Sequence, residues 1–273
     1  MMERFARPMP SDVLGTVLRI GGVPVERVRS RGVSADAPTL IYLHGGAYVL
    51  SSPATHRPIT VAFARRGFRV VAPEYRLAPE HPFPAALDDA VAVYRGLLDG
   101  GVPPGRIALA GESAGGGLAL STLLRLRDLG LPAPAAAALF SPWTDLALTG
   151  ATLRSNDAVD PIFHARHAVS VAAHYLGDAD PYDPLASPVY ADLSDLPPLL
   201  IHVGKTEILL DDSLRVADRA RAAGTDVSLR VWPRVPHGWQ LLASILPEAR
   251  RSVDEAAAFI KARVAARAAR VAA

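Results

Sequence analysis

A serine flanked by small residues lies where a chain can expose a nucleophile. Residues 111–115 read Gly-Glu-Ser-Ala-Gly, between an apolar run at 106–110 typical of a buried strand and a run at 116–124 typical of a helix. Such a turn is a nucleophile elbow, because its small residues let the chain bend sharply and expose the serine hydroxyl. Ser113 is therefore a candidate nucleophile. Taken alone, the pentapeptide also fits a glycine-rich helix N-terminus capped by Ser113.

A serine hydroxyl needs a base to take its proton and a carboxylate to orient that base. Five histidines follow the serine: His164, His167, His174, His202 and His237. His237 lies after the last predicted strand and before the final helix, where the base of such a site is expected. The first three fall in an irregular region and favour surface or lid positions. His202 lies within a predicted strand, which favours a core histidine.

Three acidic residues follow the strand predicted at 199–203 and are candidates for the carboxylate. Glu207 lies closest to the strand end, whereas Asp211 and Asp212 precede a predicted helix, as N-cap residues do. We expect Glu207 to be the acid, with Asp211 as the alternative. Lys205 could compete for the Glu207 carboxylate, although a solvated lysine is the simpler interpretation.

When a serine attacks a carbonyl carbon, the tetrahedral intermediate carries a negative oxygen, which needs N–H donors to stabilise it. Residues 44–47 read His-Gly-Gly-Ala directly after the strand predicted at 39–43. A tight loop of this kind can direct its backbone N–H groups at one point, together with the N–H of Ala114. Losing one such donor typically lowers turnover by ~10²–10³. A plain turn at the end of a strand is the alternative interpretation of Gly45 and Gly46.

The predicted elements must bring these candidates together. Strand-like runs alternate with helical patterns along most of the sequence. The strands are predicted at 23–29, 39–43, 68–72, 106–110, 134–140, 199–203 and 226–232, and the helices at 55–66, 85–98, 116–129, 212–223 and 248–269. This alternation predicts an α/β fold with a mostly parallel sheet covered on both faces, and the first strand as an antiparallel edge. Since ligands bind beyond the carboxyl ends of such strands, the candidates should meet at one rim.

Length and composition fit one large domain. The chain has 273 residues, half of them apolar, and a net charge of +2. It can bury a sizeable core, and no basic block indicates a nucleic-acid partner. The absence of cysteine excludes disulfides and thiolate metal sites. The first residues lack the apolar core of a signal peptide, and no run approaches the ~20 apolar residues of a membrane span, so we expect a cytoplasmic protein.

The sequence resembles the bacterial hormone-sensitive-lipase family of α/β-hydrolases. The resemblance is carried by residues 44–48, 75–86, 111–116, 197–200, 207–213 and 236–237, among which the twelve-residue stretch Tyr-Arg-Leu-Ala-Pro-Glu-His-Pro-Phe-Pro-Ala-Ala is specific to the family. It implies a carboxylesterase, without cofactor or metal, that cleaves short-acyl esters through an acyl-enzyme. It also implies one α/β-hydrolase domain over 1–273, with a helical cap from about 1–20 and 145–196.

The resemblance assigns roles to individual residues. Ser113 is matched to the nucleophile, His237 to the base and Glu207 to the acid, which is Glu in a subset of the family. The oxyanion donors are matched to the amides of Gly46, Ala47 and Ala114, with His44 and Gly45 as supporting motif residues.

Three features depart from the family pattern. Ala47 replaces the third glycine of the oxyanion loop, and Glu112 replaces a common Asp beside the nucleophile. Only 43 residues precede His44, where many members have several dozen more. We therefore expect an incomplete cap, a more open acyl pocket and a tendency to associate through exposed apolar surface.

Other functions fit the same residues. The same machinery could cleave lactones, amides or carbamates, or transfer the acyl group, because pocket shape decides the leaving group. A non-catalytic small-ligand receptor is a further alternative, as in the plant gibberellin receptors that resemble this family, but these have lost the histidine that corresponds to His237. The expected partner is a small ester. Dimers are common in the family, so the resemblance also allows a homodimer.

Overall fold

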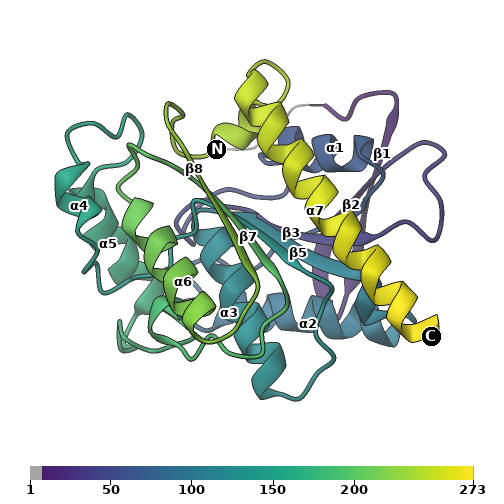
Figure 1. The fold of residues 1–273 in the computed structure, drawn as a ribbon, viewed down its shortest axis with the longest axis horizontal. Coiled ribbons are helices and arrows are strands. Elements are labelled where there is room, and N and C mark those ends of the chain that lie inside the picture. The colour runs from purple at the N-terminus through teal and green to yellow at the C-terminus, as the bar shows by residue number, and fades with distance from the viewer. Residues whose placement is uncertain (1–7, 273) are drawn as a thin grey trace.

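The computed structural model describes residues 8–272, and its centre is one eight-stranded sheet (Figure 1). The spatial order is β1-β2-β4-β3-β5-β6-β7-β8. The strands are β1 (Val13–Ile20), β2 (Val23–Ser30), β3 (Thr39–Leu43), β4 (Arg69–Pro73), β5 (Ile107–Glu112), β6 (Ala137–Phe140), β7 (Leu199–Gly204) and β8 (Val227–Trp232). Of the eight strands only β2 points in the opposite direction to the others, so the prediction of a mostly parallel sheet is confirmed.

Helices cover both faces of the sheet. The core helices are α1 (Arg57–Arg65), α2 (Ala85–Asp99), α3 (Ala114–Asp128), α6 (Leu210–Ala222) and α7 (Pro247–Ala272). Successive side chains of a strand point to opposite faces. Thus Leu40 of β3 packs in one core cluster with α1 and α7, whereas Ile41 packs in the other with α2, α3 and α6. This two-sided burial explains why the central strands read as continuous apolar runs.

Residues 145–196, which we call the cap, interrupt the alternation between β6 and β7. The cap contains α4 (Thr152–Ser155) and α5 (Ala165–Leu176), and both lie near α6 at one side of the molecule (Figure 1). Three short 3₁₀ helices complete the described elements, at Pro104–Arg106, Pro188–Tyr190 and Trp239–Leu242. None of the described helices is long and apolar enough to span a bilayer. The cytoplasmic location stays a prediction.

Three expectations about the elements differ from the structure. Residues 13–20, expected in the cap, form the edge strand β1, while residues 1–7 of the same segment lie outside the described residues. The strand predicted as an edge is β2, which lies between β1 and β4. Asp211 and Asp212 are not N-cap residues, because α6 begins at Leu210 and both carboxylates lie in its first turn. Acidic side chains there stabilise the positive end of the helix dipole.

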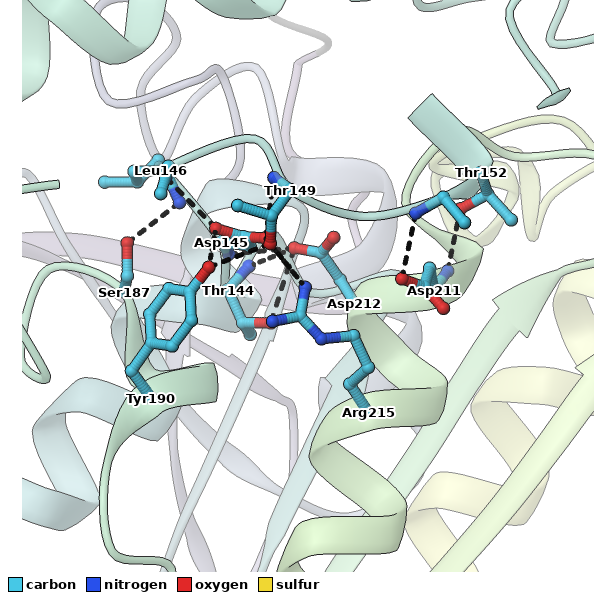
Figure 2. A network of polar contacts seen from close by, with 12 residues as sticks. Thr144, Asp145, Leu146, Thr149, Thr152, Ser187, Tyr190, Asp211, Asp212 and Arg215 are labelled. Carbon is cyan, nitrogen blue, oxygen red and sulfur yellow. Dashed lines mark hydrogen bonds and ion pairs between the residues drawn. The ribbon is translucent and has the colours of Figure 1, made fainter. Parts of the chain in front are cut away.

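A buried polar junction joins the start of the cap to α6 (Figure 2). Asp212 Oδ2 accepts hydrogen bonds from the amides of Thr144 (2.7 Å) and Asp145 (2.9 Å). The Asp145 carboxylate in turn accepts from Arg215 (2.7 Å) and the Thr149 hydroxyl (2.6 Å). Burial raises the pKa of Asp212 to about 7, against the lowering effect of these amide donors. Asp212 Oδ1 has no hydrogen-bond partner in the described part of the chain, which fits a protonated carboxyl.

Asp212→Asn should make the free energy of unfolding less dependent on pH. Folded Asp212 holds its proton up to about pH 7, whereas its ordinary pKa is 3.8. The folded state therefore binds more protons between these values, and wild-type stability falls as pH rises, by at most ~4 kcal/mol from this group. Asparagine is neutral throughout, so urea unfolding at pH 4 to 8 should show the variant gaining stability relative to wild type as pH rises.

The matched control is Asp211→Asn, the same substitution at the adjacent, partly exposed carboxylate. A difference between Asp212→Asn and wild type that stays constant from pH 4 to 8 would contradict a protonated Asp212.

Candidate active site

Ser113 lies at the turn between β5 and α3, in a backbone conformation that is costly for a non-glycine residue. Its φ is 55° and its ψ is −126°, and strained residues of this kind cluster at functional sites. The turn also approaches the end of β3 closely. A Cβ on Gly115 would lie 2.1 Å from the carbonyl oxygen of Leu43 and 2.4 Å from that of His44, so only glycine fits. The elbow is thereby placed against the loop that follows β3.

Glu207 and His237 meet across the loops that follow β7 and β8. His237 Nδ1 lies 2.5 Å from Glu207 Oε2, and the other oxygen, Oε1, accepts from the Ser141 hydroxyl (2.7 Å) and the Gly204 amide (2.5 Å). Burial by itself lowers the pKa of His237, but the charge and the hydrogen bond of Glu207 outweigh it, so the pKa is raised above 6.5. His237 Nε2 is buried and has no partner in the described part of the chain. It is available to a group placed by the elbow.

Asp211 and Lys205 are not part of this contact. The Asp211 carboxylate accepts from the Ala151 amide (3.0 Å), and its own amide donates to the Thr152 hydroxyl at 2.9 Å (Figure 2). The Lys205 side chain is exposed. Of the two candidate acids, the geometry brings only Glu207 to His237.

The loop after β3 turns its backbone through three consecutive residues of positive φ: Gly46 (117°), Ala47 (55°) and Tyr48 (64°). A Cβ on Gly46 would lie 2.2 Å from the carbonyl oxygen of Leu50, which makes glycine necessary there. Within the described residues, the amides of Gly46, Ala47 and Ala114 donate to no acceptor. They are free to bind an anionic oxygen.

Glu112 holds this loop in place by a hydrogen bond to its backbone. Its buried carboxylate accepts from the Gly45 amide (2.6 Å), the Tyr42 hydroxyl (2.6 Å) and His56 Nε2 (2.7 Å). Burial by itself raises the pKa of Glu112, but the charge of His56 and the hydrogen bonds from His56 and Tyr42 outweigh it, so the pKa is lowered. The pKa of His56 is raised against the effect of burial by the same partner. Both directions describe a buried ion pair, Glu112 with protonated His56.

His44 supports the loop as a neutral side chain. Burial, followed by the charge of His56, lowers its pKa to about 3. Its ring stacks on Tyr75 with centroids 4.2 Å apart, and the Tyr75 hydroxyl donates to the His44 carbonyl oxygen at 2.6 Å. These contacts hold the loop at its first residue and assign His44 no proton transfer.

A small apolar pocket adjoins Ser113 beneath the cap. Its cavity volume is about 10 Å³, roughly the space of one water molecule. It is lined by Ser113, Trp143, Phe163, Ala168, Val171, Ile208 and Leu209. The expectation of a more open acyl pocket is wrong: Ser113 is only 4% exposed, because α5 supplies Ala168 and Val171 to the lining. Among the described residues, the insertion covers the site.

The remaining histidines occupy the places that the sequence predicted for them. His167 and His174 lie exposed on α5, and His164 is the N-cap residue of that helix. His202 is buried in β7, where its Nδ1 lies 2.8 Å from the Ser252 hydroxyl and burial lowers its pKa to about 3. Among the described residues, no group of three or more His, Asp or Glu side chains is placed to hold a metal ion.

Three residues near the site were missed by the sequence analysis. Ser141 binds Glu207, and its position after a predicted strand at the same rim could have indicated it. Phe163 packs its ring edge-on against His237, with centroids 4.7 Å apart and planes at 87°. His56 reaches Glu112 from 56 positions away in the sequence. Neither Phe163 nor His56 belongs to a local motif, so only the tertiary structure identifies them.

Comparisons with known proteins agree with this geometry. Residues 40–241 match the model of a family with the α/β hydrolase fold. The chain is 46% identical over 248 residues to an acetyl-hydrolase of Streptomyces hygroscopicus, covering 90% of this chain and 82% of the relative. It is 38% identical over 264 residues to an esterase of Acinetobacter venetianus, covering 95% and 86%.

Solved structures are equally similar. An esterase from the bacterial hormone-sensitive lipase family superposes with a TM-score of 0.92 at 46% identity, covering 94% of this chain and 87% of the other. The esterase EstE5, soaked with p-nitrophenyl butyrate, superposes with a TM-score of 0.93 at 40% identity, covering 97% and 89%. The chain therefore belongs to the α/β-hydrolase fold family, in its bacterial hormone-sensitive-lipase branch, and is a carboxylic ester hydrolase.

Proposed function

We propose that this chain hydrolyses short-acyl carboxylic esters through Ser113, His237 and Glu207. The Ser113 Oγ attacks the ester carbonyl carbon, and its proton passes to His237 Nε2. The tetrahedral intermediate then expels the alcohol, which takes that proton, and an acyl-enzyme remains. Water attacks the acyl-enzyme in the same way, and the acid departs as the proton returns to Ser113. Glu207 holds the imidazole by its Nδ1 and stabilises the imidazolium.

The negative charge on the carbonyl oxygen is stabilised by the amides of Gly46, Ala47 and Ala114. Preorganised N–H donors are effective in a buried site because they need no reorientation as charge develops. The methyl group of Ala47 leaves its N–H in place.

The observation that carries the proposal is the His237–Glu207 contact of 2.5 Å, with the opposite nitrogen of His237 left without a partner. A base is oriented in this way when its second nitrogen must accept a proton. The names of the relatives, an acetyl-hydrolase and an esterase, agree with this chemistry. A receptor that only binds its ligand would have no use for this pair.

The preference for short acyl groups rests on the pocket beside Ser113. A cavity of about 10 Å³ leaves no room for a long chain without movement of the cap. We therefore infer that acetyl esters react fastest, followed by propionyl and butyryl esters.

Ser113→Ala should abolish the release of p-nitrophenol from its acetate ester, because alanine has no hydroxyl group to attack the ester carbonyl carbon. Removing a member of such a triad typically lowers turnover by ~10⁴ or more. Initial rates of the purified variant, measured beside wild type, test this. Hydrolysis that survives the substitution would overturn the assignment of Ser113.

The acid is tested by a matched pair of carboxamides. Glu207→Gln should lower kcat by about 10³-fold or more, since the wrong tautomer of His237 would be favoured. Asp211→Asn should leave kcat within a few-fold of wild type, because Asp211 contacts the cap. The reverse result would identify Asp211 as the acid.

Enlarging the pocket should shift the acyl preference. Val171→Ala removes two carbons from the lining, and the ratio of kcat/KM for hexanoate over acetate should rise about ten-fold, the scale expected for filling apolar space. Val169→Ala, on the same helix but 60% exposed, should leave the ratio unchanged. Equal shifts in both variants would show that the pocket does not set the acyl length.

Glu112→Gln should lower kcat about ten- to hundred-fold by releasing the loop that carries two oxyanion donors. Glutamine cannot accept from Gly45, Tyr42 and His56 together. The control is Glu26→Gln, which breaks another largely buried pair, with Arg57, and whose carboxylate bonds to no residue of the loop 44–48. We expect thermal unfolding to show a lower Tm for both variants, and a loss of kcat in Glu112→Gln alone. An unchanged kcat in folded Glu112→Gln would refute this role.

A further inference from the structure

The loop that carries Glu207 is held largely by side chains of the cap. Residues 205–209 lie between β7 and α6, outside regular structure. Asn156 Nδ2 donates to the carbonyl oxygens of Glu207 (2.9 Å) and Lys205 (3.1 Å). The Thr152 hydroxyl donates to the carbonyl oxygen of Ile208 (2.8 Å). The backbone on both sides of the Glu207 side chain is therefore fixed by a segment about 50 positions earlier in the sequence.

Asp160 makes the most extensive of these contacts. The residue is buried, with only 3% of its surface exposed. Oδ2 accepts from the Ile208 amide at 2.9 Å, next to Glu207. Oδ1 accepts from the amides of Ile162 (2.9 Å) and Phe163 (3.0 Å). One carboxylate thus joins the loop that carries Glu207 to the cap segment that carries Phe163.

Through Phe163, whose amide binds Asp160, the cap also contacts the His237 imidazole. Phe163 packs edge-on against His237 at 4.7 Å between centroids. The negative charges of three carboxylates raise the pKa of His237: Glu207 after β7, which contacts it directly, Asp160 in the cap and Glu112 at the end of β5. Asp160 is the member of this set that belongs to the cap.

We propose that Asp160 and Asn156 are positioning residues, through which the cap holds Glu207 and the His237 imidazole in the arrangement needed for catalysis. The inference rests on the proposed function. It makes the cap a structural part of the triad as well as the cover of the acyl pocket. A cap that shifts would loosen the acid and the packing on the base together.

Asp160→Asn tests the proposal, because asparagine has the same shape but replaces one acceptor oxygen by a donor. Either the Ile208 amide or the amides of Ile162 and Phe163 then lose their acceptor oxygen. We expect kcat for p-nitrophenyl acetate to fall about ten-fold with a smaller change in KM. The acid limb of the pH profile of kcat/KM should move to lower pH, because one negative charge that raises the pKa of His237 is gone.

Asp157→Asn is the matched control. Asp157 lies in the same segment and accepts from the Ala165 amide at the start of α5 (2.7 Å), but its side chain is 45% exposed and bonds to no residue of the Glu207 loop. It should keep both kcat and the acid limb of wild type. A role in stability alone would lower the Tm of either variant and leave the acid limb in place. An unmoved acid limb in Asp160→Asn, or an equal shift in Asp157→Asn, would overturn the proposal.

Asn156→Ala is a second variant that keeps the proposal testable if Asp160→Asn does not fold. It removes the donors to Glu207 and Lys205 but no charge, so kcat should fall several-fold while the acid limb stays in place. An unchanged kcat would refute the role of Asn156. Wild-type hydrolysis that requires Ser113 is measured in parallel, so a failure of the proposed function is distinguished from a failure of this inference.

Discussion

The close approach of two backbones at the end of the sheet is the constraint on which the rest of the site depends. The first turn of α3 lies so near the end of β3 that a Cβ at Gly115 would be 2.1 Å from the Leu43 carbonyl oxygen. Parallel neighbours β3 and β5 end at the same rim, so this contact places Ser113 beside the loop 44–48. The strain at Ser113 follows from turning the chain within one residue, and the packed ends of both strands maintain it.

Two buried carboxylates secure the two sides of the site by the same physical means. Glu112 accepts three hydrogen bonds and fixes the loop 44–48, while Glu207 accepts hydrogen bonds on both oxygens and fixes the His237 imidazole. A buried carboxylate without such partners would destabilise the folded state, because its charge would be removed from water without compensation. With these partners, each carboxylate holds together chain segments that are distant in the sequence. Glutamine has a similar size but only one acceptor oxygen, so it cannot make the same set of contacts at either position.

The cap is attached to the rest of the molecule at two places. Its entry is fixed to α6 through Asp145, Asp212 and Arg215 (Figure 2), and its middle is fixed to the Glu207 loop through Asn156 and Asp160. The pocket beside Ser113 is lined by Phe163, Ala168 and Val171 of the cap and by Ile208 and Leu209 of the Glu207 loop. A cap held at several points by buried polar contacts can define a small pocket, because its apolar residues have little freedom to retreat.

The sequence by itself determined the parallel sheet and identified Ser113 and His237 as candidates, since these depend on short-range patterns: apolar runs, an elbow motif and the place of a residue after a strand. It favoured Glu207 by proximity to a strand end and left Asp211 open. Only the tertiary structure shows that Glu207, and not Asp211, meets His237, because that contact joins two loops that are distant in the sequence. The closed pocket, His56 and Asp160 were likewise decided by contacts between distant segments. Periodicity records which face of an element is buried, but it does not record what that face meets.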